Sequence, residues 1–196
     1  MVNLMSKIGF TTSRSPTNKT RTFIHDMVSM VPNSSRIPRG SANEIFCLTS
    51  MKNQGYETAI IVNSVKGNPN FVRLFSLTDE IEELSYAIKI RGLTLSRDYL
   101  EKRRQRKPAV SILISTLENP VEEEILRKFL GISNVSIEKF KDKEYVTVYA
   151  DYLDKDEGII FIEFLDKNNK QTGPRIKLRI IKRNVQNKDI EKLDGD

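Results

Sequence analysis

The residues most able to bind an anion lie together near the N-terminus, in the segment TTSRSPTNKTR at positions 11–21. The segment holds two arginines, one lysine and several hydroxyl side chains, and it holds no carboxylate. Ser15 is typical of a helix cap and Pro16 of a first helical position, so we expect a helix to begin here. The first N–H groups of a helix have no intrahelical partner and bind phosphate readily. The segment therefore predicts a phosphate site, and an ordinary helix start with surface charges is the alternative.

Positive charge is concentrated in two parts of the chain. The 196 residues have a formal net charge of +6 and a pI of about 9.3, which favours an anionic partner. Residues 1–43 contain six basic side chains and a single carboxylate, Asp26, and a second basic stretch, KRRQRK, fills 102–107. This stretch could bind RNA or could be a solubilising linker, and the sequence favours neither. Acidic residues gather elsewhere, at 79–83, 122–124 and 151–157.

Contacts to the backbone of folded RNA are the chemistry that these cations suit best. Arginine, lysine and hydroxyl groups position a phosphate backbone without reading its sequence. Aromatic residues are not interleaved with the basic ones, which disfavours a module that stacks single-stranded bases and favours recognition of RNA by its shape. The candidate RNA-binding residues are Ser13, Arg14, Thr17, Lys19, Arg21, Arg36, Arg39, Lys66, Arg103, Arg104, Arg106 and Arg175.

Enzymatic and metal chemistry have little support in the sequence. His25, the only histidine, falls on a helical position away from the apolar stripe, and we expect it to be solvated. Cys47, the only cysteine, lies among apolar residues and is expected in the core. One histidine and one cysteine cannot form a usual zinc site, and residues 66–69 lack the spacing of a P-loop. We therefore expect a non-enzymatic protein with no metal, no cofactor and no small-molecule substrate.

The composition is that of a soluble globular protein, with 38% hydrophobic and 30% charged residues. No apolar run reaches the roughly 18–20 residues of a membrane span, and the N-terminus lacks the features of a secretory signal. A single cysteine suits a reducing compartment. We expect a cytoplasmic protein that contacts no membrane.

Apolar periodicity predicts helices and strands in the arrangement of an α+β fold. The first predicted helix buries Phe23, Ile24, Met27, Val28 and Val31 and ends at Pro32-Asn33. The second runs from about Ala42 to Asn53, with Ile45, Phe46, Leu48 and Met51 inward. The third begins at Asn119-Pro120 and buries Ile125, Leu126, Phe129 and Leu130. Strands are predicted at 58–62, 71–77, 84–90, 110–116, 145–149, 158–165 and 175–181, with a bulge at Gly92.

The two halves of the chain resemble copies of one unit. The predicted helix starts at Pro16 and Pro120 lie 104 residues apart. AIIV (59–62) and IIFI (159–162) lie 100 residues apart, and the strand starts at Asn68-Pro69 and Gly173-Pro174 lie 105 apart. These similar offsets suggest an internal duplication, in which YVTVYADY (145–152) replaces the second helix of the first half. Chance similarity between α/β segments is the alternative.

Four ordered motifs resemble the Brix domain. FTTSRSPTNKTRTFIHDM (10–27) and VPNSSRIPRGS (31–41) are similar to its N-terminal signature. IIVNSVKGNPNF (60–71) is similar to its central strand and turn, and TGPRIKLRII (172–181) to its closing strand. The resemblance extends from about Gly9 to Arg183. The matching positions are Thr12, Ser13, Arg14, Pro16, Arg21, Arg36, Arg39, Gly40, Gly67, Pro69, Gly173, Pro174 and Arg175.

The resemblance implies a ribosome-biogenesis factor that binds rRNA or pre-rRNA through a basic face, with other assembly proteins as further partners. A protein-interaction scaffold whose partners hold the RNA is the alternative. The resemblance also implies two tandem halves, each similar to the anticodon-binding domain of class II aminoacyl-tRNA synthetases. The nearest subgroup is the small-subunit processome type in a minimal, archaeal-looking version, although DEIEELSYAIKI (79–90) departs from the Gly-Pro-Thr of that subgroup. We expect one Brix domain at 1–184, made of halves 1–98 and 109–184 joined by a basic linker at 99–108, and a flexible tail at 185–196.

Overall fold

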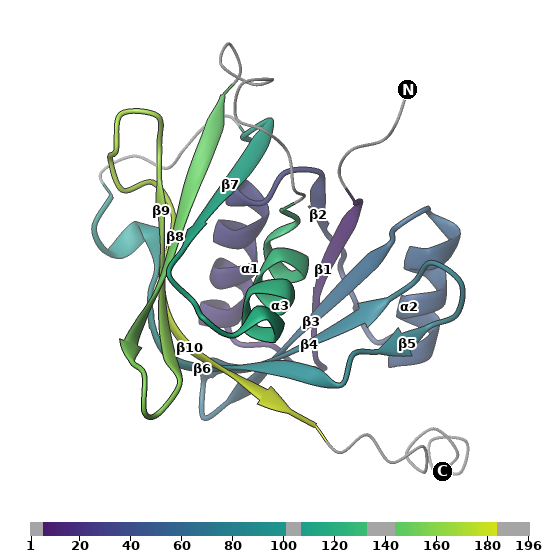
Figure 1. Ribbon diagram of the computed structural model, residues 1–196. Helices are drawn as coiled ribbons and strands as arrows, with labels where there is room; N and C mark the ends of the chain where they lie inside the picture. Colours follow the sequence, from purple (N-terminus) through teal and green to yellow (C-terminus); the bar gives the residue numbers. More distant parts are fainter. Residues whose placement is uncertain (1–5, 101–106, 133–143, 184–196) are drawn as a thin grey trace.

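The strands form one sheet that curls around two helices, as Figure 1 shows. The computed structural model describes residues 6–100, 107–132 and 144–183. The elements of the first half are β1 (Ile8–Thr12), α1 (Asn18–Met30), β2 (Ser34–Arg36), α2 (Glu44–Asn53), β3 (Thr58–Val65), β4 (Asn68–Ser76), β5 (Glu82–Glu83), β6 (Tyr86–Thr94) and the 3₁₀ turn η1 (Ser96–Asp98). Those of the second half are β7 (Val110–Ser115), α3 (Pro120–Leu130), β8 (Tyr145–Asp154), β9 (Ile159–Leu165) and β10 (Arg175–Lys182).

The strand order is β2-β1-β3-β4-β6-β10-β9-β8-β7, with β5 paired to β4. β1 is parallel to both β2 and β3, and β7 is parallel to β8. The other neighbouring strands are antiparallel, including β6 and β10, which come from different halves of the chain and pair along their whole lengths. The prediction of an α+β fold is confirmed.

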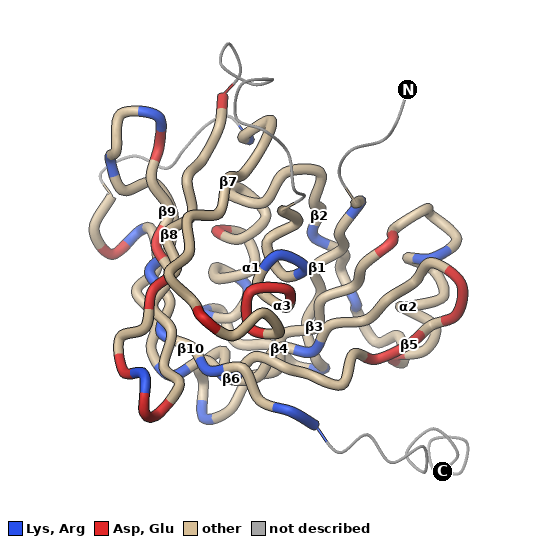
Figure 2. The backbone as a smooth tube through the Cα atoms, viewed as in Figure 1, with Lys and Arg blue, Asp and Glu red and all other residues tan. Residues whose placement is uncertain are grey.

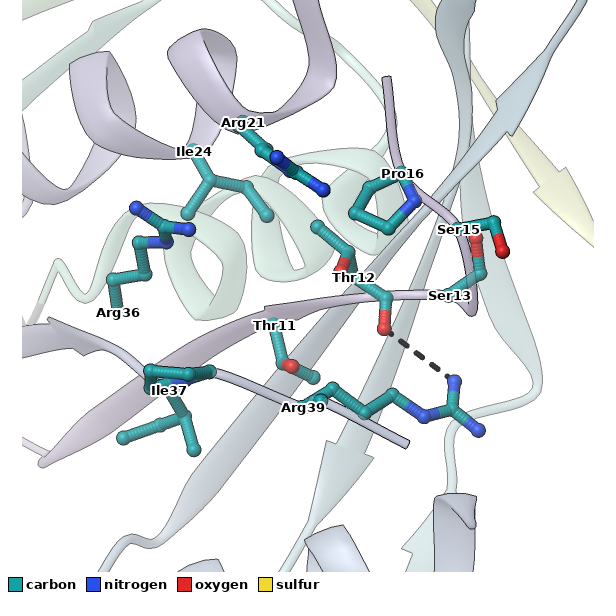
Figure 3. A pocket seen from close by; sticks show the side chains of 12 residues that line it. Thr11, Thr12, Ser13, Ser15, Pro16, Arg21, Ile24, Arg36, Ile37 and Arg39 are labelled. Carbon is teal, nitrogen blue, oxygen red and sulfur yellow. Dashed lines mark hydrogen bonds between the residues drawn. The ribbon is translucent and has the colours of Figure 1, made fainter. Parts of the chain in front are cut away.

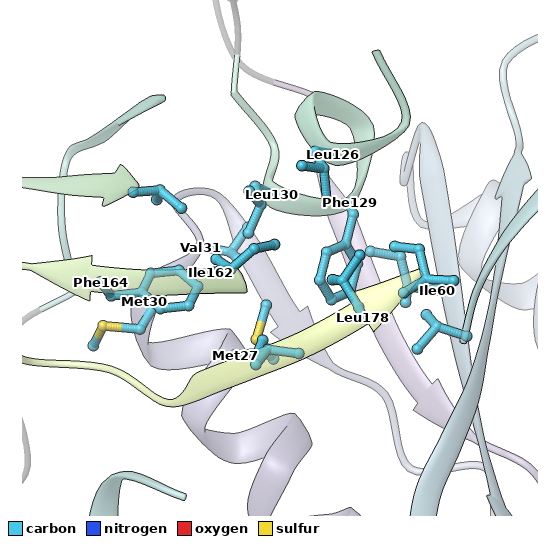
Figure 4. Close-up of a cluster of buried hydrophobic side chains, with 14 of the residues drawn as sticks. Met27, Met30, Val31, Ile60, Leu126, Phe129, Leu130, Ile162, Phe164 and Leu178 are labelled. Atoms are coloured by element: carbon cyan, nitrogen blue, oxygen red, sulfur yellow. The ribbon is translucent and has the colours of Figure 1, made fainter. Parts of the chain in front are cut away.

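The main core lies on the concave side of the sheet, where α1 and α3 share one cluster of buried apolar side chains (Figure 4). Phe129 of α3 meets Phe10 of β1 edge to face, with 6.2 Å between ring centroids. Met27 of α1 and Leu178 of β10 belong to the same cluster and have no exposed surface. The predicted apolar stripes of both helices are confirmed, with Val28 only partly buried.

A second, smaller core lies between α2 and the other face of the sheet. β3 serves both cores, because Ile60 and Val62 point into the main core while Ala59 and Ile61 point toward α2. A strand buried on both faces needs a continuous apolar run, which explains why residues 59–62 do not alternate with polar ones.

The first helix begins later than its sequence predicts. Thr17, and not Ser15, caps α1, and the Thr17 hydroxyl accepts a hydrogen bond from the N–H of Thr20 at 3.3 Å. Ser15 has a φ of +54°. A residue in this left-handed region turns the chain, so Pro16 precedes the cap instead of opening the helix. The predicted end at Pro32-Asn33 is confirmed, since α1 stops at Met30.

The predicted inward face of α2 is partly wrong. Leu48 and Met51 are buried, but Ile45 is 47% exposed and Phe46 is 66% exposed. On a helix with 3.6 residues per turn, the face that holds positions 47, 48 and 51 also includes position 44 and excludes 45 and 46. Position 44 is Glu44, which reaches the sheet through an ion pair with Arg73. The face of α2 that packs on the sheet thus combines buried apolar residues with a carboxylate that pairs with a strand arginine.

The third helix and the bulge agree with their predictions. Asn119 caps α3, its side-chain oxygen accepting from the N–H of Val121 at 3.0 Å, and the helix ends at Gly131 in the left-handed conformation. In the β6–β10 ladder Lys177 pairs with Gly92 whereas Leu178 pairs with Ile90, so one residue of β6 is extra next to Gly92.

Two of the three offsets that suggested a duplication do not match in the structure. Residues 59–62 lie in β3, which is parallel to β1, whereas 159–162 lie in β9, which is antiparallel to both of its neighbours. The strand that occupies the place of β3 is β8, because β8 pairs in parallel with the strand before α3. The segment YVTVYADY therefore corresponds to β3 and not to the position of α2. Residues 101–106 of the predicted linker and the whole predicted tail, 185–196, lie outside the described residues.

The exposed and buried phenylalanines should differ sharply in their effect on stability. Phe129→Ala removes a ring that is 1% exposed and should lower the free energy of unfolding by about 3–5 kcal/mol. Phe46→Ala should change it by less than about 0.5 kcal/mol, because the ring already contacts water. Urea unfolding of the two variants measures the difference. A large loss for Phe46→Ala would contradict the orientation of α2.

Candidate nucleic-acid interface

The carboxyl ends of β1 and β2 form a point where the chain connections diverge. The chain leaves β1 through α1 to reach β2 on one side, and it leaves β2 through α2 to reach β3 on the other side. The two helices cover opposite faces of the sheet. In sheets with parallel strands, ligands bind in the crevice outside the carboxyl ends at such a switch point.

A pocket of about 320 Å³ lies at this point (Figure 3). Its lining contains no carboxylate and includes four of the predicted residues, Ser13, Arg21, Arg36 and Arg39. The remaining lining residues are Thr11, Thr12, Ser15, Pro16, Ile24, Ile37, Pro38 and Gly40. In Figure 3 the side chains of Arg21 and Arg36 lie on the α1 side of β1, and that of Arg39 lies on the opposite side.

Arg39 holds the wall of the pocket together. Its side chain is only 8% exposed. The Nε of Arg39 donates to the carbonyl of Ala42 at 3.1 Å, and its Nη1 donates to the carbonyl of Thr12 at 3.4 Å. The same nitrogen lies 3.8 Å from the Glu44 carboxylate. These contacts tie the end of β1 to the start of α2, so this arginine is placed to shape the pocket more than to reach a ligand outside it.

Arg14, Arg21 and Arg36 have exposed side chains. Among the described residues, none forms a hydrogen bond or a salt bridge with the guanidinium groups of these three arginines. Guanidinium groups without such partners keep their N–H donors available for phosphate, which they bind in a bidentate manner.

The β3–β4 turn lies beside the N-terminus of α1. The Thr17 hydroxyl donates to the carbonyl of Gly67 at 2.9 Å, and the Lys19 ammonium donates to Asn68 Oδ1 at 2.8 Å. Lys66, exposed and with a φ of +47°, is held by this turn close to the helix. Together the exposed or partly exposed cations at this end of the molecule form what we call the basic face: Arg14, Lys19, Arg21, Arg36 and Lys66.

Some predicted residues lie elsewhere. Arg175 starts β10, where its guanidinium stacks 5.0 Å above the ring of Tyr99. The neighbouring Gly173 packs against Met30 at the far end of α1. A helix of 13 residues is about 20 Å long, so Arg175 does not join the basic face. The predicted residues Arg103, Arg104 and Arg106 lie outside the described part of the chain.

The start of α3 has the opposite charge. Glu122 and Glu123 occupy its first turn, which is red in Figure 2. The Glu118 carboxylate before it pairs with Lys155 of the β8–β9 turn at 2.7 Å. The Tyr152 hydroxyl donates to Glu122 at 2.5 Å, and burial together with this hydrogen bond raises the pKa of Tyr152 to about 12. Both helix starts therefore contact a hairpin turn, but only the α1 start does so with unpaired arginines around it.

The residues that could support catalysis remain dispersed. His25 is exposed and Cys47 is 5% exposed within the smaller core, as predicted. Across residues 6–100, 107–132 and 144–183, no three histidine, cysteine or acidic side chains are grouped in a way that could hold a metal ion. Of the described helices, none has the length and apolarity to cross a bilayer.

Lys107, the described end of the basic stretch, is directed at the protein itself. Its ammonium donates to the Ser34 carbonyl and, at 2.9 Å, to the Ser34 hydroxyl at the start of β2. The residue as a whole is exposed, while partial burial lowers the pKa of Lys107 to about 8. This lysine therefore fastens the second half to an edge strand of the first.

Relatives of known family are similar over almost the whole chain. A probable Brix domain-containing ribosomal biogenesis protein of Sulfurisphaera tokodaii is 30% identical over 182 residues, which cover 91% of this chain and 94% of the relative. The chain belongs to the Brix-domain ribosomal biogenesis proteins. A Brix-domain protein of the same description from Thermococcus kodakarensis is 26% identical over 87% of this chain and 88% of its own length. Of the protein-family models compared with the chain, none matches.

Solved structures share the fold. A probable ribosomal biogenesis protein from Aeropyrum pernix K1 superposes with a TM-score of 0.75 at 18% identity, covering 92% of this Brix-domain chain and 98% of that structure. Mil, described as an archaeal Imp4-like protein, superposes with a TM-score of 0.58 at 15% identity, covering 89% and 99%.

Sequence patterns alone missed the pocket. Its apolar walls come from Ile24, a core residue of α1, and from Ile37, which follows β2. The strand β2 spans only Ser34–Arg36 and has no apolar alternation that could reveal it. Its register with β1 places Arg36 beside Phe10, and this pairing brings the arginine to the mouth of the pocket.

Arg39 and Arg14 should respond differently to the same substitution. Arg39→Gln removes hydrogen bonds to two partly buried carbonyls from a side chain that is only 8% exposed, and it should lower the free energy of unfolding by about 1–3 kcal/mol. Arg14→Gln removes an exposed charge and should change it by less than about 0.5 kcal/mol. Thermal or urea unfolding gives both values. Equal effects would mean that Arg39 has no structural role.

The pKa of Lys107 predicts a pH dependence of stability. In the unfolded chain this lysine has a pKa near 10.5, and in the folded protein near 8. Between these pH values the folded protein has released a proton that the unfolded chain still holds, so its contribution makes the free energy of unfolding rise with pH. Comparing urea midpoints across this window with those of Lys107→Met, which lacks the titrating group, isolates the rise. An identical pH profile for the variant would contradict the lowered pKa.

Proposed function

We propose that this Brix-domain protein binds rRNA or pre-rRNA during ribosomal subunit assembly, without catalysis, by holding phosphates on the basic face. One observation supports this most directly. Arg21 and Arg36, from two separate segments, line a pocket at the switch point with no carboxylate in its lining, and Arg14 is exposed in the same β1–α1 connection. The ribosomal biogenesis role in the descriptions of the relatives supplies the setting.

The physical basis is electrostatic. Each phosphate that a cation neutralises releases counterions, which favours binding and makes the affinity fall steeply with salt. Contacts of this kind position an RNA without reading its bases. Cations on three surface segments, the β1–α1 region, the end of β2 and the β3–β4 turn, suit a backbone that passes over a folded surface.

A protein-interaction scaffold is the second candidate, and the exposed face of α2 supports it. Ile45 and Phe46 are adjacent and largely exposed, and aromatic side chains are enriched where proteins meet. In this alternative an assembly protein covers α2 and holds the RNA itself.

The tandem arrangement of the halves also remains a proposal. We infer that β1-α1-β3-β4-β6 and β7-α3-β8-β9-β10 are copies of one unit, similar to the anticodon-binding domain of class II aminoacyl-tRNA synthetases. The symmetric strand order about β6 and β10 supports this, as do the equivalent parallel pairs β1–β3 and β7–β8. We propose that residues 1–184 act as one Brix domain.

Removing cations from the basic face should weaken RNA binding broadly. Replacing Arg14, Arg21, Arg36 and Lys66 by Gln should lower affinity for every structured rRNA fragment, and the slope of log affinity against log salt should shrink by about 3. Fluorescence anisotropy over a series of salt concentrations measures both quantities.

A matched control removes the same number of charges from exposed positions of β6 and β10, by changing Arg91, Lys177, Arg179 and Lys182 to Gln. This variant should keep most of the affinity. Loss of binding in the control alone would place the RNA on the outer side of the sheet. A protein that shifts no rRNA fragment at low salt, yet co-purifies with an assembly protein, would favour the scaffold.

A further inference from the structure

The pocket at the switch point is larger than a backbone phosphate requires. Its volume of about 320 Å³ reaches the lower end of the roughly 300–1,000 Å³ that is typical of pockets for small molecules. A surface that only follows phosphates needs cations and no cavity. Phosphate contacts alone therefore do not explain why the basic face contains this pocket.

The lining has groups for each part of a nucleotide. Arg21 and Arg36 supply unpaired guanidinium groups for a phosphate. Ser13 and Thr12 supply polar groups suited to a ribose. Ile24, Ile37, Pro16 and Pro38 supply apolar surface against which a base or sugar can pack. Binding pockets for small molecules combine such apolar walls with a few placed polar groups.

We propose that the pocket holds a single nucleotide unit, namely one nucleotide of the bound RNA turned out of its base stack. The proposal rests on the proposed function, because it adds to the basic face a place for one nucleotide. Turning a base out of a stack costs least where it is already unpaired. The pocket should therefore make the protein prefer a bulge or an unpaired junction in structured RNA over a continuous duplex.

The first experiment measures mononucleotide binding by NMR titration of the full chain. The four ribonucleoside monophosphates should perturb the resonances of the pocket, and at least one should bind about tenfold or more tightly than inorganic phosphate or the unphosphorylated nucleosides. Arg36→Gln should weaken this binding by about tenfold or more. Equal affinity for inorganic phosphate and the monophosphates would reduce the pocket to a phosphate site and overturn the proposal.

The last experiment separates an RNA nucleotide from a free one. A short RNA duplex with a one-nucleotide bulge should bind more tightly than the same duplex without it, and the best monophosphate should compete with the bulged RNA. Mononucleotide binding without competition would assign the pocket to a free nucleotide and overturn the proposal. RNA that binds through the basic face with no preference for the bulge would overturn it as well, while leaving the proposed function intact. Absence of any RNA binding would instead end the proposed function itself.

Discussion

The structure depends on one apolar core that two helices from different halves of the chain share. α1 and α3 bury their apolar stripes in the same cluster, and the edge-to-face contact of Phe10 with Phe129 joins β1 to α3. The β6–β10 ladder closes the sheet around this cluster. Neither helix has a core of its own, so the two halves must fold against each other. The position of the α1 N-terminus therefore depends on the packing of α1 against residues of α3, more than 100 positions later in the sequence.

Local sequence patterns correctly predicted the helices and strands that bury one regular apolar face. The stripes of α1 and α3 have helical spacing with clear caps or stops, and the strands on the main core follow their apolar residues. These sequence patterns failed where tertiary contacts determine the position or orientation of an element. The inward face of α2 includes Glu44, whose pairing with Arg73 no local pattern reveals, and β2 is too short to have a pattern. The similar sequence offsets between the two halves did not identify equivalent strands for a related reason. Loops of different length shift the equivalent strands by different numbers of residues.

For the candidate site, the sequence identified the charges but not the geometry. Arginines near one helix start were predicted to act together, and Arg21 and Arg36 do line one pocket. Parallel pairing of β1 and β2 produces that proximity, and the same pairing makes Arg39 a structural residue with a nearly buried side chain. Three arginines of similar appearance in the sequence therefore have different environments, and the contacts of Arg39 with Thr12, Ala42 and Glu44 distinguish it from the other two.

The fastening of the β3–β4 turn to α1 has a consequence for the folding of the protein in the presence of a ligand. The two hydrogen bonds, from Thr17 to Gly67 and from Lys19 to Asn68, each join residues about 50 positions apart. An unfolded chain has the same charges, but they are spread along a flexible polymer and enclose no pocket. A polyanion that engages the turn, the helix start and the end of β2 together binds the native chain in preference to the unfolded one, and by mass action it raises the stability of the protein that holds it. Binding of such a ligand is thus coupled to folding, and the protein without the ligand is less stable than the protein that holds it.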